Sequence, residues 1–282
     1  MANDYGTEAL GLIAGKGDYP RELALSARTQ GVTRLIAVAF KKETDPSIEQ
    51  WVDEVIWLRV GQLDSLLESF RSRGIRQVVM AGQITPTHLF HARPDGAMLR
   101  LLAGLTKRNA HTIFGAVGEA LLANHIELKP ASLFMESAMP EVGTLSSRVP
   151  TCQEQQDIGL GMDVARMTSG LDIGQTVVIK EGTILAVEAF EGTDATIRRA
   201  GKLGGKGAVI VKVAKSEHDM RFDIPVIGEQ TLHVLKKVKA SVLAVQARRS
   251  ILLNRARLIQ MADAQGLCLT AVEIGEEITG AM

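Results

Sequence analysis

Short apolar segments alternate with helical segments along the first part of the chain, and this alternation limits its possible folds more than any other feature. The apolar run LGLIAG is followed by a helical pattern at 21–30 and by the strand-like RLIAVAF. A second cycle consists of the strand-like EVIWLRV, the helical LDSLLESFRSRG and the strand-like RQVVMAGQI. Such alternation builds a parallel sheet with helices on its faces. We therefore predict an α/β fold that begins with an N-terminal Rossmann-like parallel sheet.

The later part of the chain continues the α/β pattern but contains a hairpin signal. The runs TVVIK and TILAVEAF alternate in hydrophobicity and are joined by Glu181-Gly182, as in antiparallel strands. Since 282 residues exceed the roughly 100–200 of a typical domain, we expect two domains. The residues 137–151 are rich in Ser, Pro, Gly and Thr and have no apolar period, which favours a linker. The prediction is an N-terminal nucleotide- and substrate-binding domain over 1–136, a linker over 137–151 and a C-terminal catalytic, mixed-sheet α/β domain over 152–282.

Composition argues against several classes of protein. Lys plus Arg and Asp plus Glu number 32 each, so the bulk charge does not attract a polyanion, and we predict no nucleic-acid partner. Cys152 and Cys268 lack the spacing of a disulfide framework or a zinc site. The N-terminal apolar run is too short and glycine-broken for a signal peptide or a membrane span. We expect a cytoplasmic protein whose membrane contact is peripheral.

A glycine-rich turn stands where many α/β proteins bind phosphate. Gly15 and Gly17 follow a predicted strand and precede a predicted helix, a place where exposed backbone N–H groups can bind an anion. The turn is a poor dinucleotide fingerprint, because Pro20 stands where the third glycine would fall. A tight turn without a ligand is an equally good interpretation.

A second glycine, Gly82, ends a later strand at what should be the same edge of the sheet. Gly82 would let a ligand approach the backbone, and the Gln83 side chain could form a hydrogen bond to a uracil or a sugar. The alternative is a plain strand terminus.

Carboxylates and guanidinium groups meet at one strand-to-helix junction, VEAFEGTDATIRRAG. Thr193 or Asp194 could cap the following helix, and Arg198 and Arg199 lie in its first turns. Anion donors and hard oxygen ligands side by side would suit a phosphate ester bound to Mg²⁺. An ordinary capped helix with a solvated arginine pair is the alternative. The predicted metal ligands at this junction are Glu188, Glu191 and Asp194.

Asp223 lies within a short apolar run, between Phe222 and Ile224, and Pro225 favours an extended conformation there. Carboxylates are seldom buried unless they are paired, hydrogen-bonded or bound to a metal. Asp223 therefore either caps the helix near Gly228 or takes part in chemistry.

Four of these segments carry a resemblance to a known family: LGLIAGKGDYP, LDIGQTVV, LAVEAFEGTDATIRR and FDIPVIGEQTL. Together they resemble the LpxI-type UDP-2,3-diacylglucosamine pyrophosphatases of lipid A biosynthesis, over nearly the whole chain. The resemblance implies hydrolysis of the pyrophosphate bond of UDP-2,3-diacylglucosamine, with water attacking the α-phosphorus. The implied products are UMP and 2,3-diacylglucosamine 1-phosphate. It also implies a requirement for Mg²⁺, with Mn²⁺ as the alternative, and an acyl-sugar held between the two domains.

The resemblance also assigns residues. Asp223 matches the essential aspartate of the family, as a metal ligand or as a general base, so it joins the predicted metal ligands. The family has a Gly-Asp-Asp sequence near the end of its first domain, where this chain has Asn109-Ala110-His111. If those acids help to hold metal or sugar, Asn109 and His111 must substitute for them, and the choice of substrate could differ. The residues predicted to bind substrate are Gly15, Gly17, Gly82, Gln83, Gln175, Thr193, Arg198 and Lys212.

Two other functions remain open on the sequence: a nicotinamide-dependent oxidoreductase and a non-catalytic protein that binds nucleotide sugars. Acyl chains would need an apolar cleft, for which Phe90, Phe134 and Met135 are candidate lining residues, although they could equally belong to a core. A lipid-linked substrate implies transient contact with the inner face of the inner membrane. We also expect a homodimer, the commonest soluble oligomer.

Overall fold

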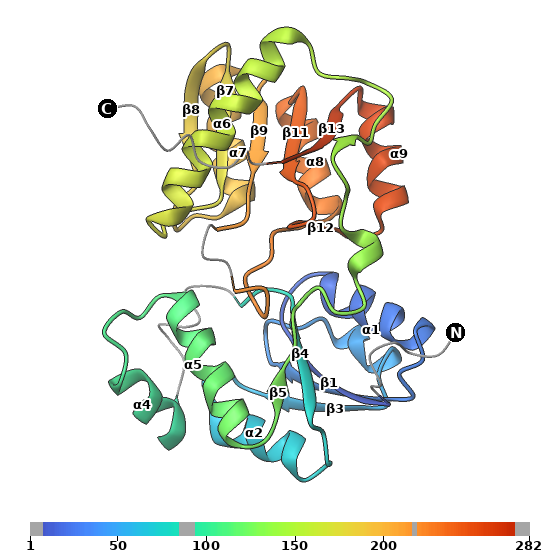
Figure 1. Cartoon of the computed structure of the whole chain (residues 1–282), viewed down its shortest axis with the longest axis vertical. Coiled ribbons are helices and arrows are strands. Elements are labelled where there is room, and N and C mark those ends of the chain that lie inside the picture. The colour runs from blue at the N-terminus through green and yellow to red at the C-terminus, as the bar shows by residue number, and fades with distance from the viewer. Residues whose placement is uncertain (1–7, 85–93, 216–218, 274–282) are drawn as a thin grey trace. The chain divides into compact units, whose positions relative to one another are not determined.

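The computed structural model describes residues 8–84, 94–215 and 219–273, which fall into two compact units (Figure 1). The first unit comprises Met1–Glu136 together with Asp219–Asp223, and the second comprises Ser137–His218 and Ile224–Met282. The short segment Asp219–Asp223 thus belongs by its contacts to the first unit, although the chain around it belongs to the second.

The first unit contains a five-stranded sheet in the order β3-β2-β1-β4-β5, and all of its neighbouring strands are parallel. This confirms the predicted parallel sheet. The central strand reads as a continuous apolar run, as expected for a strand that is covered on both faces. The strands are β1 (Ala9–Ala14), β2 (Arg34–Phe40), β3 (Glu54–Leu58), β4 (Gln77–Ala81) and β5 (Glu127–Leu128).

The helices of the first unit begin at recognisable local signals. Asp95 accepts a hydrogen bond from the Met98 backbone N–H at 3.0 Å, and Asn109 accepts one from the Thr112 N–H at 2.8 Å, so each caps the helix that follows it. Phe70 and Leu121 lie in the core between helices and sheet. The helices are α1 (Tyr19–Thr29), the 3₁₀ helix η1 (Pro46–Gln50), α2 (Leu63–Arg71), α4 (Gly96–Ala103) and α5 (Ala110–Ala123). A further 3₁₀ turn, η2 (Glu136–Ala138), begins at Glu136, where the chain passes from the first unit to the second.

The second unit contains a mixed sheet in the order β6-β13-β11-β9-β7-β8. Strands β9, β11 and β13 are parallel, whereas the β7–β8 hairpin and β6 pair in the antiparallel sense, which confirms the predicted mixed sheet. The strands are β6 (Gly143–Thr144), β7 (Thr176–Lys180), β8 (Thr183–Val187), β9 (Val209–Lys212), β11 (Val242–Gln246) and β13 (Cys268–Val272); a separate parallel pair consists of β10 (Val226–Ile227) and β12 (Ile251–Leu252).

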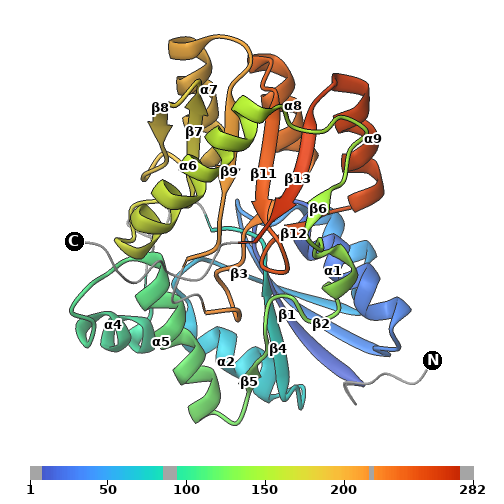
Figure 2. The same ribbon diagram turned by 45° about the horizontal axis from the view of Figure 1, so that its top comes forward.

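Helices cover both faces of this second sheet (Figure 2). Alternate residues of each strand point to opposite faces, so Val177 and Val209 pack in the core under α6, whereas Val178 and Ile210 pack under the other helices. The sheet is therefore covered by α6 on one face and by α7, α8 and α9 on the other. The helices are α6 (Cys152–Gly170), α7 (Thr193–Gly204), α8 (Glu229–Val238) and α9 (Arg255–Gln265).

None of the helices in the described part of the chain combines the length and the apolar character needed to cross a membrane.

The hairpin turn between β7 and β8 is held by a buried carboxylate of α6. Asp157 is 3% exposed, and its two oxygens accept the backbone N–H groups of Glu181 at 2.9 Å and Gly182 at 2.8 Å. Both turn residues have positive φ, as a tight two-residue hairpin requires. The hairpin is thus attached to the helix that covers it.

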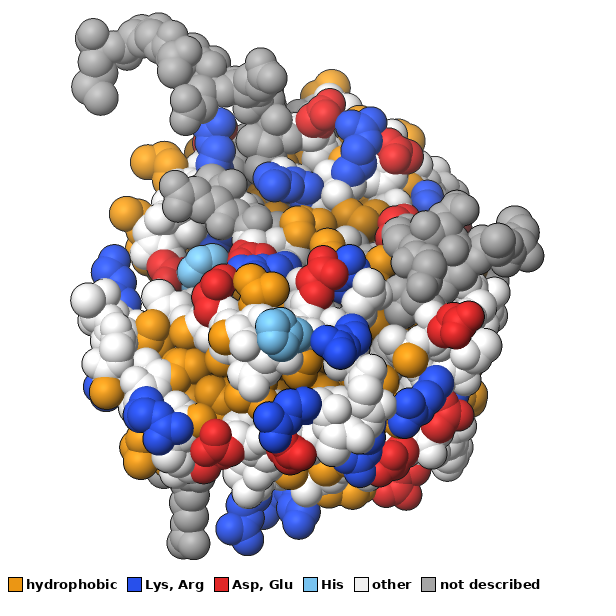
Figure 3. All heavy atoms as spheres, turned by 60° about the horizontal axis from the view of Figure 1, so that its bottom comes forward, with side chains coloured by type: hydrophobic (Ala, Val, Ile, Leu, Met, Phe, Trp, Pro, Cys, Tyr) orange, Lys and Arg blue, Asp and Glu red, His pale blue; other side chains and the backbone are white. Residues whose placement is uncertain are grey.

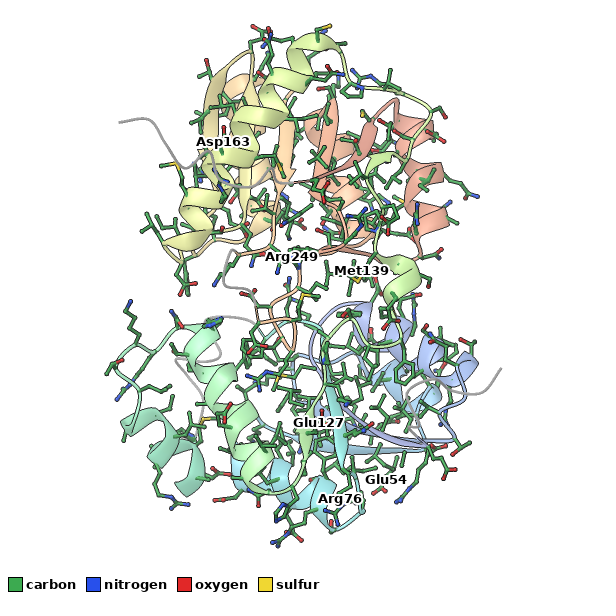
Figure 4. All side chains as sticks on the ribbon, viewed as in Figure 1. Glu54, Arg76, Glu127, Met139, Asp163 and Arg249 are labelled. Carbon is green, nitrogen blue, oxygen red and sulfur yellow. The ribbon has the colours of Figure 1, made fainter. Side chains whose placement is uncertain are left out.

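Replacing Asp157 with Ala is expected to lower the free energy of unfolding by about 1–3 kcal/mol, because two backbone donors lose their acceptor. Urea denaturation of the variant and of the wild type measures this difference. The matched control is Asp163→Ala on the same helix, labelled in Figure 4, where the side chain is 73% exposed and the change should stay within about 0.5 kcal/mol. Equal midpoints for the two variants would contradict the assigned role of Asp157.

Candidate functional site

The glycine-rich turn after β1 is bonded to the end of β4. The Gly15 N–H donates to the Ala81 carbonyl at 2.7 Å, and Lys16 and Gln83 exchange backbone hydrogen bonds of 2.7 and 3.1 Å. A Cβ atom on Gly15 would lie 2.6 Å from the Gln83 carbonyl oxygen, and one on Gly82 would lie 2.7 Å from that of Lys16. Both glycines therefore let the two loops touch.

This arrangement favours the tight-turn interpretation over a phosphate cradle at Gly15, because the N–H groups of Gly15 and Lys16 are already used within the protein. Gly17 is different, since its φ of +94° needs glycine while nothing lies within 4 Å of a Cβ placed there. The side chain of Gln83 is exposed.

An apolar cavity lies within the first unit, where its strands end. Ile13 near the end of β1, Phe40 at the end of β2 and Met80 near the end of β4 form its floor. Ligands of open α/β sheets bind at this edge. Phe134 and Met135 do not line this cavity; they are buried core residues, and Phe90 lies outside the described residues.

The segment Asp219–Asp223 forms a tight turn that its own side chains hold in place. Arg221 donates to both carboxylate oxygens of Asp219, with distances of 3.0 Å from Nε to Oδ1 and 2.7 Å from Nη2 to Oδ2. The backbone N–H groups of Phe222 and Asp223 both donate to the Asp219 carbonyl, at 3.2 and 3.0 Å. Hydrogen bonding from Arg221 lowers the pKa of Asp219, which keeps this pair charged.

The same turn is bonded to the rest of the first unit. The Ala131 N–H donates to the Met220 carbonyl at 2.6 Å, and the Phe222 ring packs against the rings of His111 and Phe114 at centroid distances of 5.6 and 5.9 Å. Because His111 and Phe114 lie on α5, the turn and this helix form one packed group.

Asp223 ends this turn and lies beside His111. Its side chain is 21% exposed, and its Oδ2 is 3.9 Å from His111 Nδ1, which is too long for a direct hydrogen bond. The N-cap of α8 is Gly228, without a side-chain hydrogen bond, so Asp223 does not have the capping role that was one of its two interpretations. Of the two residues expected to replace the missing acids, Asn109 is used as a helix cap and His111 is the one near Asp223.

In the second unit, four side chains meet where β7 and β9 approach the start of α7; we call Thr176, Glu188, Thr193 and Lys212 the Thr193 cluster. Lys212, which is 7% exposed, donates from Nζ to Thr193 Oγ1 at 2.9 Å. Thr193 in turn donates to Glu188 Oε1 at 3.0 Å. An ammonium group only donates and a carboxylate only accepts, so the direction of these two bonds is determined.

Thr176 is the member of the Thr193 cluster that the sequence analysis missed. Its side chain is fully buried, and its Oγ1 lies 3.3 Å from that of Thr193. Since the Thr193 proton goes to Glu188, Thr176 donates to Thr193. The sequence feature that could have identified Thr176 is its place directly after Gln175, at the start of a largely apolar strand. Gln175 itself accepts the Val213 N–H with its backbone carbonyl, at 3.0 Å.

The N-cap of α7 is Gly192, and no side chain caps this helix, so the expected capping by Thr193 or Asp194 is wrong. Thr193 is instead the first helical residue, and its hydroxyl is used in the Thr193 cluster. Asp194 lies 3.7 Å from Arg198, between Oδ2 and Nη2, and its Oδ1 is 3.4 Å from Thr231 Oγ1.

The carboxylates of the junction have different partners. Glu191 Oε1 accepts from Arg199 Nη2 at 2.5 Å, a hydrogen bond that lowers the pKa of Glu191. Glu188 is bonded to Thr193. In the described part of the chain, no three His, Cys, Asp or Glu side chains are grouped as a ready metal site. The junction is therefore not a preformed cage of Glu188, Glu191 and Asp194.

The Thr193 cluster still fits a Mg²⁺ ion of the kind that arrives with a phosphorylated substrate. Such ions usually keep several waters and bind through one or two carboxylates plus substrate phosphates. Glu188 Oε2 is buried and has no hydrogen-bond partner among the described residues, so this oxygen has a lone pair to offer. Glu188 is the junction carboxylate that fits best.

Charge is mixed over the surface that Figure 3 presents, where Lys and Arg side chains lie among Asp and Glu side chains.

Two protein-family models together match almost the whole chain. The model of the LpxI N-terminal domain matches residues 9–138, and that of the LpxI C-terminal domain matches residues 141–270. The chain is 30% identical over 277 residues to the UDP-2,3-diacylglucosamine pyrophosphatase LpxI of Caulobacter vibrioides, which covers 94% of this chain and 97% of that protein.

Two solved structures resemble the chain much less closely. The biotin carboxylase domain of the Hydrogenobacter thermophilus 2-oxoglutarate carboxylase is 12% identical, with a TM-score of 0.27 over 68% of this chain and 40% of that one. An N5-carboxyaminoimidazole ribonucleotide synthetase from Thermotoga maritima is 12% identical, with a TM-score of 0.24 over 64% of this chain and 41% of that one. Scores this low carry no conclusion about fold or function.

Proposed function

This chain belongs to the LpxI family, and on that premise we propose that it hydrolyses the pyrophosphate bond of UDP-2,3-diacylglucosamine. The products would be UMP and 2,3-diacylglucosamine 1-phosphate, which places the enzyme in lipid A biosynthesis. The observation that carries the proposal is the match of both family domains, together with a relative of that named activity over nearly the full length of both chains.

The two alternative functions are less well supported. A nicotinamide-dependent oxidoreductase would use the glycine-rich turn, whose Gly15 and Lys16 N–H groups are already bonded to the β4 loop. A non-catalytic nucleotide-sugar-binding protein would bind the same substrate without releasing UMP, and the experiment below tests that outcome directly.

The reaction is a hydrolysis in which the oxygen of water attacks the α-phosphorus. A bond forms between that oxygen and phosphorus, the bridging anhydride bond breaks, and its electron pair leaves with the acylated sugar phosphate. Mg²⁺, or Mn²⁺ in its place, would be held by Glu188 or Asp223 and would neutralise charge on the phosphate oxygens when bound.

The residues of the chain supply the other parts of the proposed mechanism. Asp223 takes the proton of the attacking water if it is the general base, and it holds the metal if it is a ligand. Lys212 presents a fixed positive charge, whose position is maintained by its bond to Thr193. We keep Gly17, Gln83, Gln175 and Arg198 as proposed substrate contacts.

Incubation with UDP-2,3-diacylglucosamine in ¹⁸O-labelled water tests both the activity and the position of attack. We expect UMP that carries the label, release that stops with EDTA, and recovery on addition of Mg²⁺. Label in the sugar phosphate would place the attack on the other phosphorus. Tight binding without UMP would support the non-catalytic alternative.

The lipid-linked substrate leads us to propose two further properties. The protein would act in the cytoplasm and touch the inner face of the inner membrane transiently, and it would form a homodimer. Flotation with phospholipid vesicles and light scattering after gel filtration measure these properties separately.

A further inference from the structure

The geometry points to Phe222 as a residue that sets which acyl chains the enzyme accepts. The apolar cavity of the first unit takes the end of one acyl chain, and Phe222 forms the wall of this cavity that is continuous with Asp223. The inference rests on the proposed function, because it concerns the acylated substrate of that reaction.

The lining of the cavity determines the class of ligand. Helices α2, α4 and α5 contribute Leu66, Met98 and Phe114 to its walls, above the floor formed by the strand ends. Gln62 is the one polar side chain among the described lining residues, and its Oε1 already accepts the Arg59 N–H at 2.7 Å. A phosphate, a sugar or a uracil would find few hydrogen-bond partners there. A hydrocarbon chain forms no hydrogen bonds with water, so its burial in this cavity is favourable.

The size of the cavity limits how much of a chain it can hold. Its volume is about 90 Å³, well below the roughly 300–1,000 Å³ of a typical small-molecule site. That space suits the end of one acyl chain better than a whole nucleotide. The two methionines in the lining can adapt their shape to small differences in chain length.

Phe222 connects this cavity to the proposed chemistry. Its ring contacts His111 and Phe114 of α5, while Asp223 is its neighbour in the chain and lies 3.9 Å from His111. Both residues belong to the turn that Arg221 and Asp219 hold together. An acyl chain that packs against Phe222 therefore binds next to Asp223, because the same turn fixes the backbone of both residues.

The test compares a series of UDP-2,3-diacylglucosamine substrates with acyl chains of increasing length. Phe222→Ala is expected to move the optimum of kcat/KM to longer chains, and Phe222→Trp to shorter ones. Each methylene that gains or loses an apolar contact should change kcat/KM by about fourfold. The matched control is Phe190→Ala in the second unit, where the side chain is 63% exposed and the length profile should stay as in the wild type.

A second variant makes the test independent of the stability of the turn. Met98→Phe narrows the cavity from the helix α4 side and is expected to shift the optimum to shorter chains, with thermal melting as the check on folding. No UMP from the wild-type protein with any chain length would overturn the proposed function and this inference with it. Wild-type turnover with length profiles unchanged in Phe222→Ala and Met98→Phe would overturn this inference alone.

Discussion

Asp223→Ala is expected to lower kcat by on the order of 10²–10⁴-fold, the usual contribution of a general base, while the protein stays folded. The turn should survive, because the substitution keeps the Asp223 backbone N–H that donates to the Asp219 carbonyl. Steady-state release of UMP measures the loss, and thermal melting verifies the fold. A nearly wild-type rate would remove Asp223 from the mechanism.

The variant Asp223→Asn separates the two roles proposed for this carboxylate. If Asp223 is the general base, kcat falls while the dependence on Mg²⁺ concentration is unchanged. If it is a metal ligand, the Mg²⁺ concentration for half-maximal activity rises. Asp163→Asn, at an exposed position of α6, serves as the control and should behave as the wild type in both measurements.

Lys212→Met is expected to lower kcat by about 10²–10³-fold, the size of loss seen when one fixed donor to a developing charge is removed. Methionine keeps most of the volume of the side chain but removes the ammonium group. In the described structure the Lys212 ammonium has Thr193 as its one hydrogen-bond partner, so two of its three N–H donors remain for a substrate phosphate. Parallel measurement of kcat and KM shows whether the loss falls on the chemical step.

The control for Lys212 is Lys180→Met in the adjacent strand β7. Lys180 Nζ donates to the Gly204 carbonyl at 2.8 Å and has no part in the Thr193 cluster, so turnover should change little. Similar losses in the two lysine variants would indicate a general electrostatic or stability effect and would contradict a specific role for Lys212.

Local patterns were sufficient for the architecture of each sheet. Alternating apolar runs and helical periods predicted the parallel sheet of the first unit, and the Glu181-Gly182 turn predicted the antiparallel hairpin that makes the second sheet mixed. Four motifs predicted the family, which the two domain matches confirm. These predictions succeed because hydrophobic periodicity and turn residues act over a few neighbouring positions.

The partners of the polar side chains could not be predicted in this way. Glu188 and Glu191 are three positions apart, yet one binds Thr193 and the other Arg199. Thr176 belongs to the Thr193 cluster because the β7–β9 pairing places it opposite Lys212, which bonds to Thr193. No spacing along the chain reports that pairing.

The parallel sheet, the mixed sheet with its hairpin, and the family can all be predicted from the sequence, since each depends on short-range pattern or on matching motifs. The position of Asp223 on a turn packed against α5, and the role of Gly15 in a contact between loops, arise only when the chain folds. The same is true of the apolar cavity that Phe222 lines. The physical reason is that these features are made by segments far apart in the chain, whose contacts arise from packing and are not encoded in any one local stretch.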